Sequence, residues 1–387
     1  MADKLLKFLA KNQRLRNASP AWMRKTARKI LPVSRYNKYL WAEENPHIGT
    51  DNEFSFKGHT KNKLGIVFDP AQYHKYYMTA CIDMNVSYEV IDIRKHNWVE
   101  LVKNSGCDGL IVWPLITTIV LKEMTDERLR LIEEDLKIPV YPPSNEVWLL
   151  DNKRRVSDWL KVNGFDQPET NGFFLEDEAI EFASRAQYPL VFKTVRGSVS
   201  HGVIILKNKE EAIRLIKKCF SKGIVQERSD PRNLQWDFVL FQEYLPDVEE
   251  KRMIRIGDTY ICIDKVKVGD FHSGSGYMKW GDPGENFLPL TKEITDKGAF
   301  KSMNVDFFIT NDGRTLVNEL HTLFHGPKIP DSDLKGRYTL EGGKWTFEQG
   351  NYYRNYCCNL RVLHFLETLG ETLPADSDQW LSLPAFG

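Results

Sequence analysis

The spacing of apolar and polar positions changes character along the chain. Between residues 61 and 145, short apolar runs such as LGIVFD and DGLIVWP alternate with longer stretches in which apolar residues recur every three or four positions. Such runs between helical stretches are typical of parallel strands joined by crossover helices. The pattern predicts one small α/β domain, with strands at 64–69, 87–93, 108–114 and 138–143 and helices at 73–84, 98–103 and 123–136.

A different pattern follows a long helix that is predicted over 146–162 and that Asn163-Gly164 would end. Strands now outnumber helices, and the turn Asn311-Asp312-Gly313 between two apolar runs is a strong hairpin signal. The remainder is therefore predicted to mix strands and helices, with helices at 176–186 and 209–220 and strands at 170–175, 188–195, 203–207, 237–245, 250–257, 259–268, 305–310 and 314–320.

Charge separates the first residues from the rest. The chain has 53 Lys+Arg against 53 Asp+Glu, but residues 1–38 hold eleven of the basic residues and a single acid, so this head carries +10 and the remainder −10. Its apolar spacing predicts two short basic amphipathic helices divided near Pro20. Two interpretations stay open: attraction to an anionic surface such as lipid headgroups, an acidic glycan or nucleic acid, or packing on the acidic body. Residues 42–60 have the composition of a polar linker.

Composition excludes several classes of protein. With 387 residues, 42% of them hydrophobic and 12% aromatic, the chain is too apolar to be disordered. Its longest uncharged apolar run, residues 110–121, is well short of the roughly 20 residues that cross a bilayer. We find no secretory signal, and six cysteines without CxxC or framework spacing favour free thiols. The expected location is a reducing cytoplasm, with peripheral contact of the basic head with the inner face of the membrane as an option.

Three local patterns carry candidate chemistry. Lys193 ends an apolar strand before the small-residue turn RGSVSHG, which would place an ammonium and backbone N–H groups around a phosphate chain, although the turn is not a P-loop. Asp306 and Glu319 face each other across the predicted hairpin, and two such acids favour Mg²⁺. The segment FQEYLPDVEEKRMIRIG offers an extended edge for adenine and acids for a ribose. Each also has a purely structural interpretation: a solvated strand end, acids paired with Lys or Arg, and an amphipathic hairpin.

Taken in this order, the pieces resemble the ATP-grasp family. The match covers roughly residues 61–326: an α/β domain, a helix that begins Asp151-Asn152-Lys153, the Lys193 strand, the Gly/Ser loop, the QEYL strand and the acidic hairpin VDFFITNDGRTLVNEL. The resemblance implies an α/β and α+β architecture in which ATP lies between two lobes. It divides the chain into a basic arm and linker (1–60), a pre-ATP-grasp α/β domain (61–145), a lid lobe (146–230) and a catalytic lobe with a C-terminal helical extension (231–387).

The resemblance also assigns the candidate ligands of ATP and Mg²⁺. The two lysines would contact the phosphates, the glycine loop would close over them, the QEYL backbone would meet adenine, and an acid would bind the ribose. The ATP-binding set is Lys153, Lys193, Gly197, Ser198, Ser200, Gly202, Gln242, Glu243, Tyr244, Leu245, Asp247 and Glu250, and the metal set is Asp306, Glu319 and His321.

One position departs from the family pattern. Family members commonly have Glu-x-Asn at the end of the metal strand, whereas this chain has Glu319-Leu320-His321, so a softer imidazole replaces an amide oxygen. Together with His325 and Glu319, His321 could alternatively bind zinc. The spacing is not HExxH, however, and an acidic pair beside phosphate-binding lysines favours Mg²⁺.

The resemblance implies a reaction as well. In most ATP-grasp enzymes a carboxylate attacks the γ-phosphate of ATP, and an amine or thiol captures the acylphosphate while a closing loop excludes water. Lys193, Arg252 and Lys265 are the expected catalytic residues, the latter two as grips for the substrate carboxylate or acylphosphate; a surface ion pair is the other interpretation of Arg252. The loop at 271–280 is either a plain hairpin loop or a substrate contact through His272, Ser273, Gly274, Ser275 and Gly276.

The leading hypothesis is an ATP-dependent carboxylate–amine ligase with ATP and Mg²⁺ as cofactors. The alternative is an ATP-grasp kinase that phosphorylates a small polar acceptor. A nucleotide sensor without turnover is disfavoured because Lys193, Asp306 and Glu319 are all present, and a nucleic-acid enzyme because the body is acidic and no RNA-binding aromatic motif occurs.

Aromatic residues crowd the segment 338–356 and suggest an acceptor. Their faces could stack on sugar rings, so the hypothesis includes a carboxylate of a cell-surface glycan or a related metabolite, amidated with an amino acid or amine in polysaccharide biosynthesis. The other interpretation is a segment that wraps the catalytic lobe, with a core-facing helix formed by Tyr352, Tyr356, Leu360, Leu363 and Leu366.

Overall fold

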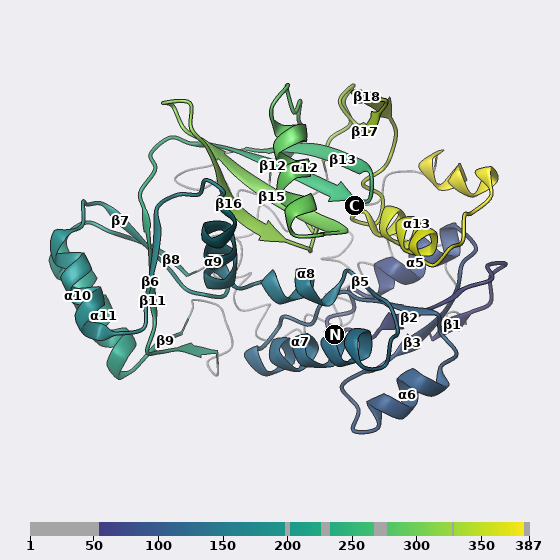
Figure 1. Ribbon diagram of the computed structural model, residues 1–387, viewed down its shortest axis with the longest axis horizontal. Helices are drawn as coiled ribbons and strands as arrows, with labels where there is room; N and C mark the ends of the chain where they lie inside the picture. The colour runs from purple at the N-terminus through teal and green to yellow at the C-terminus, as the bar shows by residue number, and fades with distance from the viewer. Residues whose placement is uncertain (1–53, 198–201, 226–232, 267–276, 327–328, 383–387) are drawn as a thin grey trace, which may run out of the picture. The chain divides into compact units, whose positions relative to one another are not determined.

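The computed structural model describes residues 54–197, 202–225, 233–266, 277–326 and 329–382, and it divides into two compact units (Figure 1). Unit 1 comprises the described residues up to 114, together with 128–141 and 351–382, and unit 2 comprises those of 115–127 and 142–350. Helix α7 (Ile119–Glu134) contributes to both. The basic head and residues 42–53 of the predicted linker lie outside the described residues.

Unit 1 is built on a five-stranded sheet in the order β1-β3-β2-β4-β5, in which β1 is antiparallel to β3 and all other neighbours are parallel. Side chains such as Leu64, Ile66 and Ile111 are fully buried, because parallel strands are covered on both faces. The parallel α/β prediction is confirmed. The elements are β1 (Ser55–Phe56), β2 (Lys63–Val67), α5 (Lys75–Asp83), β3 (Ser87–Ile91), α6 (Trp98–Asn104), β4 (Gly109–Ile111) and β5 (Val140–Tyr141).

The C-terminal segment belongs to unit 1, which differs from the predicted division. The buried guanidinium of Arg354 donates from Nε to Asp83 Oδ2 over 2.7 Å, and Asn355 and Asn359 donate to the same carboxylate. A buried carboxylate requires such donors, so these contacts attach α13 (Cys358–Thr368) to α5. The short 3₁₀ helix η2 (Ala375–Ser382) follows.

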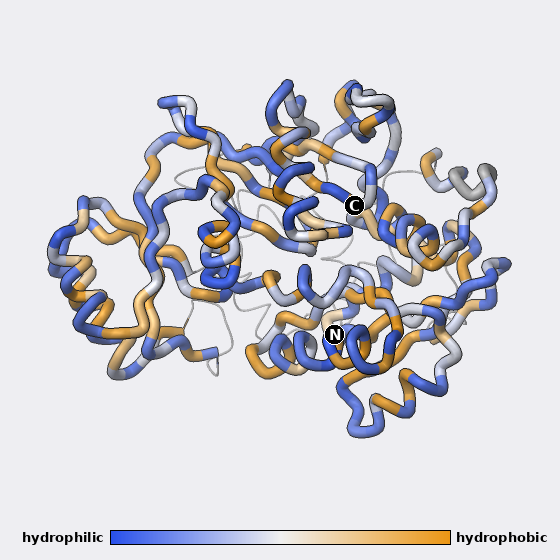
Figure 2. The backbone as a smooth tube through the Cα atoms, viewed as in Figure 1, coloured by the Kyte–Doolittle hydropathy of each residue, from blue (hydrophilic) through white to orange (hydrophobic). Residues whose placement is uncertain are grey.

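Unit 2 contains two antiparallel sheets. The four-stranded sheet has the order β6-β11-β7-β8, with strands β6 (Thr170–Phe173), β7 (Leu190–Lys193), β8 (Val203–Leu206) and β11 (Val239–Glu243). Helices α10 (Glu176–Arg185) and α11 (Lys209–Ser221) lie side by side and share a core with this sheet (Figure 1). Both helices carry apolar as well as polar positions, as Figure 2 shows. In an amphipathic helix the apolar positions recur every three or four residues and gather on the side that faces the core.

The seven-stranded sheet has the order β16-β15-β12-β13-β17-β18, and β14 also pairs with β13. Helices α9 and α12 share its core with residues of β12, β13, β15 and β16. The elements are α8 (Ser144–Leu149), α9 (Lys153–Asn163), β12 (Glu249–Ile256), β13 (Thr259–Lys265), β14 (Met278–Trp280), α12 (Phe287–Lys297), β15 (Ser302–Ile309), β16 (Thr315–His321), β17 (Gly336–Glu341) and β18 (Lys344–Gln349), besides the small pair β9 (Ile224–Val225) and β10 (Leu234–Gln235).

Three local features differ from the predicted elements. The helix expected over 146–162 is two helices, α8 and α9, because Asp151 adopts a left-handed conformation with φ 55°. The hairpin β17–β18, helix α12 and strand β14 were not predicted. Helix α13 begins only at Cys358, after Tyr352 and Tyr356, although both rings are buried. Within the part of the chain that the structure describes, no helix has both the length and the apolar character that crossing a membrane requires.

Candidate active site

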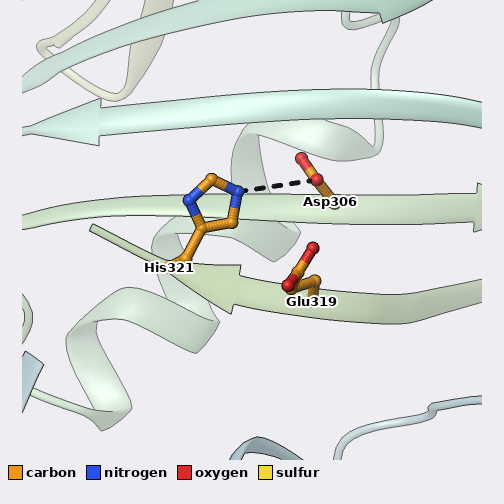
Figure 3. A group of neighbouring side chains, drawn as sticks. All are labelled: Asp306, Glu319 and His321. Atoms are coloured by element: carbon orange, nitrogen blue, oxygen red, sulfur yellow. Dashed lines mark ion pairs between the residues drawn. The ribbon is translucent and has the colours of Figure 1, made fainter. Parts of the chain in front are cut away.

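The hairpin β15–β16 brings two predicted metal ligands together. Its turn at residues 311–313 places Asp306 directly across from Glu319, and a β-bulge follows at Asp306/Phe307. The side chain of His321 comes from the same strand as Glu319, and one ligand atom from each of the three residues lies within 4.8 Å of the others. Figure 3 shows Asp306 and His321 pointing toward each other across the two strands, with Glu319 beside them.

Asp306 is the most enclosed acid of this group. It is fully buried, and the guanidinium of Arg252 holds it with two parallel bonds of 2.9 Å, from Nε to Oδ1 and from Nη2 to Oδ2. The register of β12 on β15 pairs these two residues directly, and Lys265 Nζ lies 2.5 Å from Asp306 Oδ2. Burial by itself raises the pKa of Asp306, but Arg252 and Lys265 outweigh it and hold the pKa well below its usual range. Asp306 is therefore ionised.

The same network includes Glu250, a predicted ribose ligand. Its buried carboxylate accepts a hydrogen bond from Lys265, which thus bridges Glu250 and Asp306. Arg252 and Lys265 were expected to grip a substrate; their side chains instead contact these two acids. The interpretation of Arg252 as a surface ion pair does not hold, because the pair is buried.

The imidazole of His321 lies among hydrogen-bond donors. Its Nε2 is 2.9 Å from Asn304 Nδ2 and 3.1 Å from Arg252 Nη2, and 3.7 Å from Asp306 Oδ2. A ring nitrogen beside two obligatory donors acts as an acceptor, which corresponds to the neutral imidazole protonated on Nδ1. In this arrangement the lone pair of Nε2 is already engaged.

The donor set fits a hard divalent cation. Burial raises the pKa of Glu319, but the positive charges around it, those of Lys153 and Lys265 among them, outweigh this effect and lower the pKa, so Glu319 supplies an ionised oxygen. Carboxylate oxygens are the ligands that Mg²⁺ prefers, and water and phosphate oxygens usually complete its shell. Among the described residues the group that could hold a metal consists of Asp306, Glu319 and His321; His325 is not part of it, which removes the predicted zinc alternative of two histidines and Glu319.

The two predicted phosphate-binding lysines approach this acidic pair. Lys193 ends β7, and its Nζ lies 3.3 Å from Oδ1 of Asn318, the residue next to Glu319 on β16. Burial and then the neighbouring Lys153 lower the pKa of Lys193 to about 8, while Glu319 and Glu250 oppose the shift. Since Lys153 also affects the pKa of Glu319, both ammonium groups lie within electrostatic reach of the acid.

Asp151 anchors the start of the glycine loop. Its carboxylate accepts from the backbone N–H of Gly197 over 2.9 Å and from Nε of Arg196 over 2.8 Å. Lys153 Nζ donates to the carbonyl of Gly197 over 2.5 Å. At the other end of the loop, the carbonyl of Gly202 accepts from Thr194. Ser198 and Ser200 lie outside the described residues, as does the predicted substrate loop 272–276.

Comparison with solved structures identifies the fold of the chain. No protein-family model matches the chain. A biotin carboxylase domain of the Hydrogenobacter thermophilus 2-oxoglutarate carboxylase, solved with MgADP, ADP and bicarbonate, aligns with a TM-score of 0.51 and 16% identity over 68% of this chain and 64% of that one. A RimK domain ATP-grasp protein from Sphaerobacter thermophilus aligns with a TM-score of 0.45 and 15% identity over 67% of this chain and 90% of that one.

The chain has the ATP-grasp fold. In sequence, 138 residues are 21% identical to the phosphoribosylamine–glycine ligase of Fusobacterium nucleatum, over 35% of this chain and 30% of that protein. The chain thus spans less than two thirds of this relative and of the biotin carboxylase domain. The ATP-grasp prediction for the fold is confirmed.

The predicted adenine edge of the ATP-grasp fold is shorter than the sequence suggested. Gln242 lies inside β11, where it pairs with Thr170 of β6 on one side and Val191 of β7 on the other, and its amide donates to Thr170. The backbone N–H of Glu243 donates to the carbonyl of Glu169. The strand ends at Glu243, so of the predicted QEYL edge only Tyr244 and Leu245 lie beyond it. The exposed Asp247 follows them with φ 52°.

Asn304 and Asn318 belong to the site although sequence reasoning missed both. Asn304 stands two residues before Asp306 on the same strand, so the period of two could have placed it on the same face. The contact between Asn318 and Lys193 joins residues 125 positions apart, and nothing local in the sequence indicates it.

Proposed function

We propose that this chain is an ATP-dependent carboxylate–amine ligase that works through an acylphosphate. One observation carries the proposal: two ammonium groups, from Lys153 on α9 and Lys193 on β7, approach the ionised pair of Asp306 and Glu319 from separate elements of unit 2. Cations on one side and metal-binding acids on the other are what a nucleotide triphosphate with its metal requires. The phosphoribosylamine–glycine ligase relationship supports the same class of reaction.

The proposed reaction has two steps. An oxygen of the substrate carboxylate forms a bond to the γ-phosphorus while the bond from that phosphorus to the β,γ-bridging oxygen breaks, and ADP leaves. The nitrogen of the amine then bonds to the acyl carbon, phosphate leaves and a proton is released. Lys153 and Lys193 would neutralise phosphate oxygens in the first step. When bound by Asp306 and Glu319, Mg²⁺ would supply further charge neutralisation.

In this proposal Arg252 and Lys265 do not grip the substrate, which was the role predicted from the sequence. Their contacts are with Asp306 and Glu250, so we assign them to holding Asp306 ionised and correctly oriented for the cation. The adenine would meet the backbone of Tyr244 and Leu245, and Asp247 would bind the ribose. The glycine loop would exclude water once the nucleotide is bound.

The burial of the aromatic segment bears on the acid substrate. A glycan carboxylate was inferred from the aromatic segment, but Tyr352, Tyr353 and Tyr356 are buried and cannot stack on a sugar. Phe347 is 41% exposed, and its ring packs against Tyr338. The proposal therefore specifies a small carboxylate and an amine, with a sugar acid as one member of the panel to be tested.

The decisive experiment measures phosphate release from ATP and Mg²⁺ by the full chain. A panel of uronic acids and amino acids is offered with and without amines. A ligase releases phosphate only when an acid and an amine are both present. A kinase instead yields a stable phosphorylated product from a single acceptor without free phosphate, and that outcome would replace the proposal. Lys217→Met, on the exposed side of α11, serves as the control variant that should behave as wild type.

A further inference from the structure

Asp151 and Lys153 hold the same glycine from its two polar groups. The carboxylate of Asp151 accepts from the backbone N–H of Gly197 over 2.9 Å, and Nζ of Lys153 donates to the carbonyl of Gly197 over 2.5 Å. Gly197 has φ 124°, a conformation that residues with a side chain rarely adopt. The position of this glycine is therefore coupled to two side chains at the start of α9.

The side chain of Asp151 is itself fixed in place. Its Oδ2 accepts from Nε of Arg196 over 2.8 Å and lies 2.6 Å from Nη2 of the same guanidinium, which also donates to the carbonyl of Ile116. The backbone of Asp151 is left-handed, with φ 55°, which aspartate tolerates better than most residues. A carboxylate that a guanidinium holds through charge-assisted bonds has little freedom to turn, so Oδ1 keeps the N–H of Gly197 in one place.

This arrangement determines where the ammonium of Lys153 lies. An ammonium has three donors at the end of a flexible stem. One donor is bound by the carbonyl of Gly197, and among the described residues Nζ makes no further hydrogen bond, so two donors remain for phosphate oxygens. Held in this way, the ammonium lies within electrostatic reach of Lys193 and Glu319. The carbonyl of Gly197 thus keeps a flexible side chain beside the proposed phosphate site.

We propose that Asp151 is a positioning residue for nucleotide binding and acts through Lys153. Its carboxylate orients Gly197, and the carbonyl of Gly197 holds the ammonium of Lys153 where it meets the phosphates. An ammonium that is ordered in advance binds phosphate more tightly, because the entropy of ordering a long side chain is lost before the nucleotide arrives. The inference rests on the proposed function, which assigns Lys153 to the phosphates.

A double-mutant cycle in the full chain tests this coupling, with MgADP binding measured by ligand-observed NMR so that weak affinities stay measurable. Asp151→Gly keeps the left-handed backbone and removes the carboxylate, and it should weaken binding about tenfold. In a chain that already carries Lys153→Met, the same change should alter the affinity by less than about twofold, because the ammonium that it positions is gone. A purely structural role would weaken binding equally in both backgrounds. Asp158→Asn, an exposed acid on the same helix, should bind as wild type.

A second variant keeps the test decisive if Asp151→Gly does not fold. Asp151→Asn tolerates the left-handed conformation and keeps one oxygen, so it should retain at least part of the affinity, and its deficit should also vanish beside Lys153→Met. Thermal unfolding without nucleotide checks that each variant is folded.

Two outcomes would overturn the inference and leave the proposed function intact: wild-type affinity of Asp151→Gly, or equal losses with and without the Lys153 ammonium. A wild-type chain that binds no MgADP would refute both. A Lys153→Met chain that binds MgADP as tightly as wild type would refute the phosphate role of Lys153 in the proposed function, and the inference with it.

Discussion

The pKa of Lys193 leads to a measurable pH dependence of nucleotide binding. Burial and the neighbouring Lys153 lower this pKa from 10.5 to about 8. Only the ammonium form can neutralise a phosphate, so binding of ADP should weaken as the lysine loses its proton. With a pKa near 8, the charged fraction falls about tenfold between pH 7 and pH 9, and the dissociation constant of MgADP should rise by about the same factor.

Calorimetric titration with MgADP from pH 6.5 to 9.5 measures this profile. Lys193→Arg keeps its charge across the range, so its profile should be flat. Lys193→Met should bind weakly at every pH and also show no dependence. The matched control, Lys217→Met on α11, should reproduce the wild-type curve. A wild-type affinity that stays constant up to pH 9.5 would refute the reasoning, and so would a Lys193→Met profile parallel to that of wild type.

Stability without nucleotide should change in the opposite direction. The pKa of Lys193 is lower in the folded chain than the 10.5 of the unfolded chain, so the unfolded state binds more protons between these values. The contribution of Lys193 to the free energy of unfolding therefore increases as the pH rises from about 8 to 10.5. The difference in urea midpoint between wild type and Lys193→Met over this range measures it. A loss of ADP binding that accompanied falling stability would indicate general alkaline unfolding instead.

Three other substitutions or treatments give independent checks. Glu319→Gln should lower kcat at least about 100-fold in a phosphate-release assay, because a neutral amide binds the cation poorly; activity close to wild type would contradict the metal assignment. Asp83→Ala should reduce the stability of unit 1 by about 3–5 kcal/mol in urea unfolding, since it leaves the buried Arg354 without its carboxylate; a urea unfolding curve identical to that of wild type would show that this pair contributes little. In the native chain an aromatic disulfide reagent should modify Cys107 faster than the five buried cysteines, all of which should react after unfolding; a second fast thiol would contradict the described burial.

Much of the framework followed from local patterns in the sequence. Apolar runs separated by helical stretches identified the parallel sheet, because strands covered on both faces must be apolar throughout. The turn Asn311-Asp312-Gly313 determined that Asp306 and Glu319 would face each other, since a hairpin turn fixes the register of its strands. Lys193 was recognisable because it directly follows a short apolar run and precedes a turn of small residues. These features depend on residues close together in the chain.

The identity of the partners of Asp306 was a property of the tertiary structure alone. Arg252 meets this acid because β12 lies beside β15, and Lys265 reaches it from the strand beyond, over separations of 54 and 41 residues. Likewise, the C-terminal residues join unit 1 because Arg354 supplies charge to Asp83, 271 positions earlier. A carboxylate that is buried must find a cation, but the sequence does not say which one. The order of the strands in the sheet decides which cation lies beside the carboxylate, and that order results from the packing of the whole core.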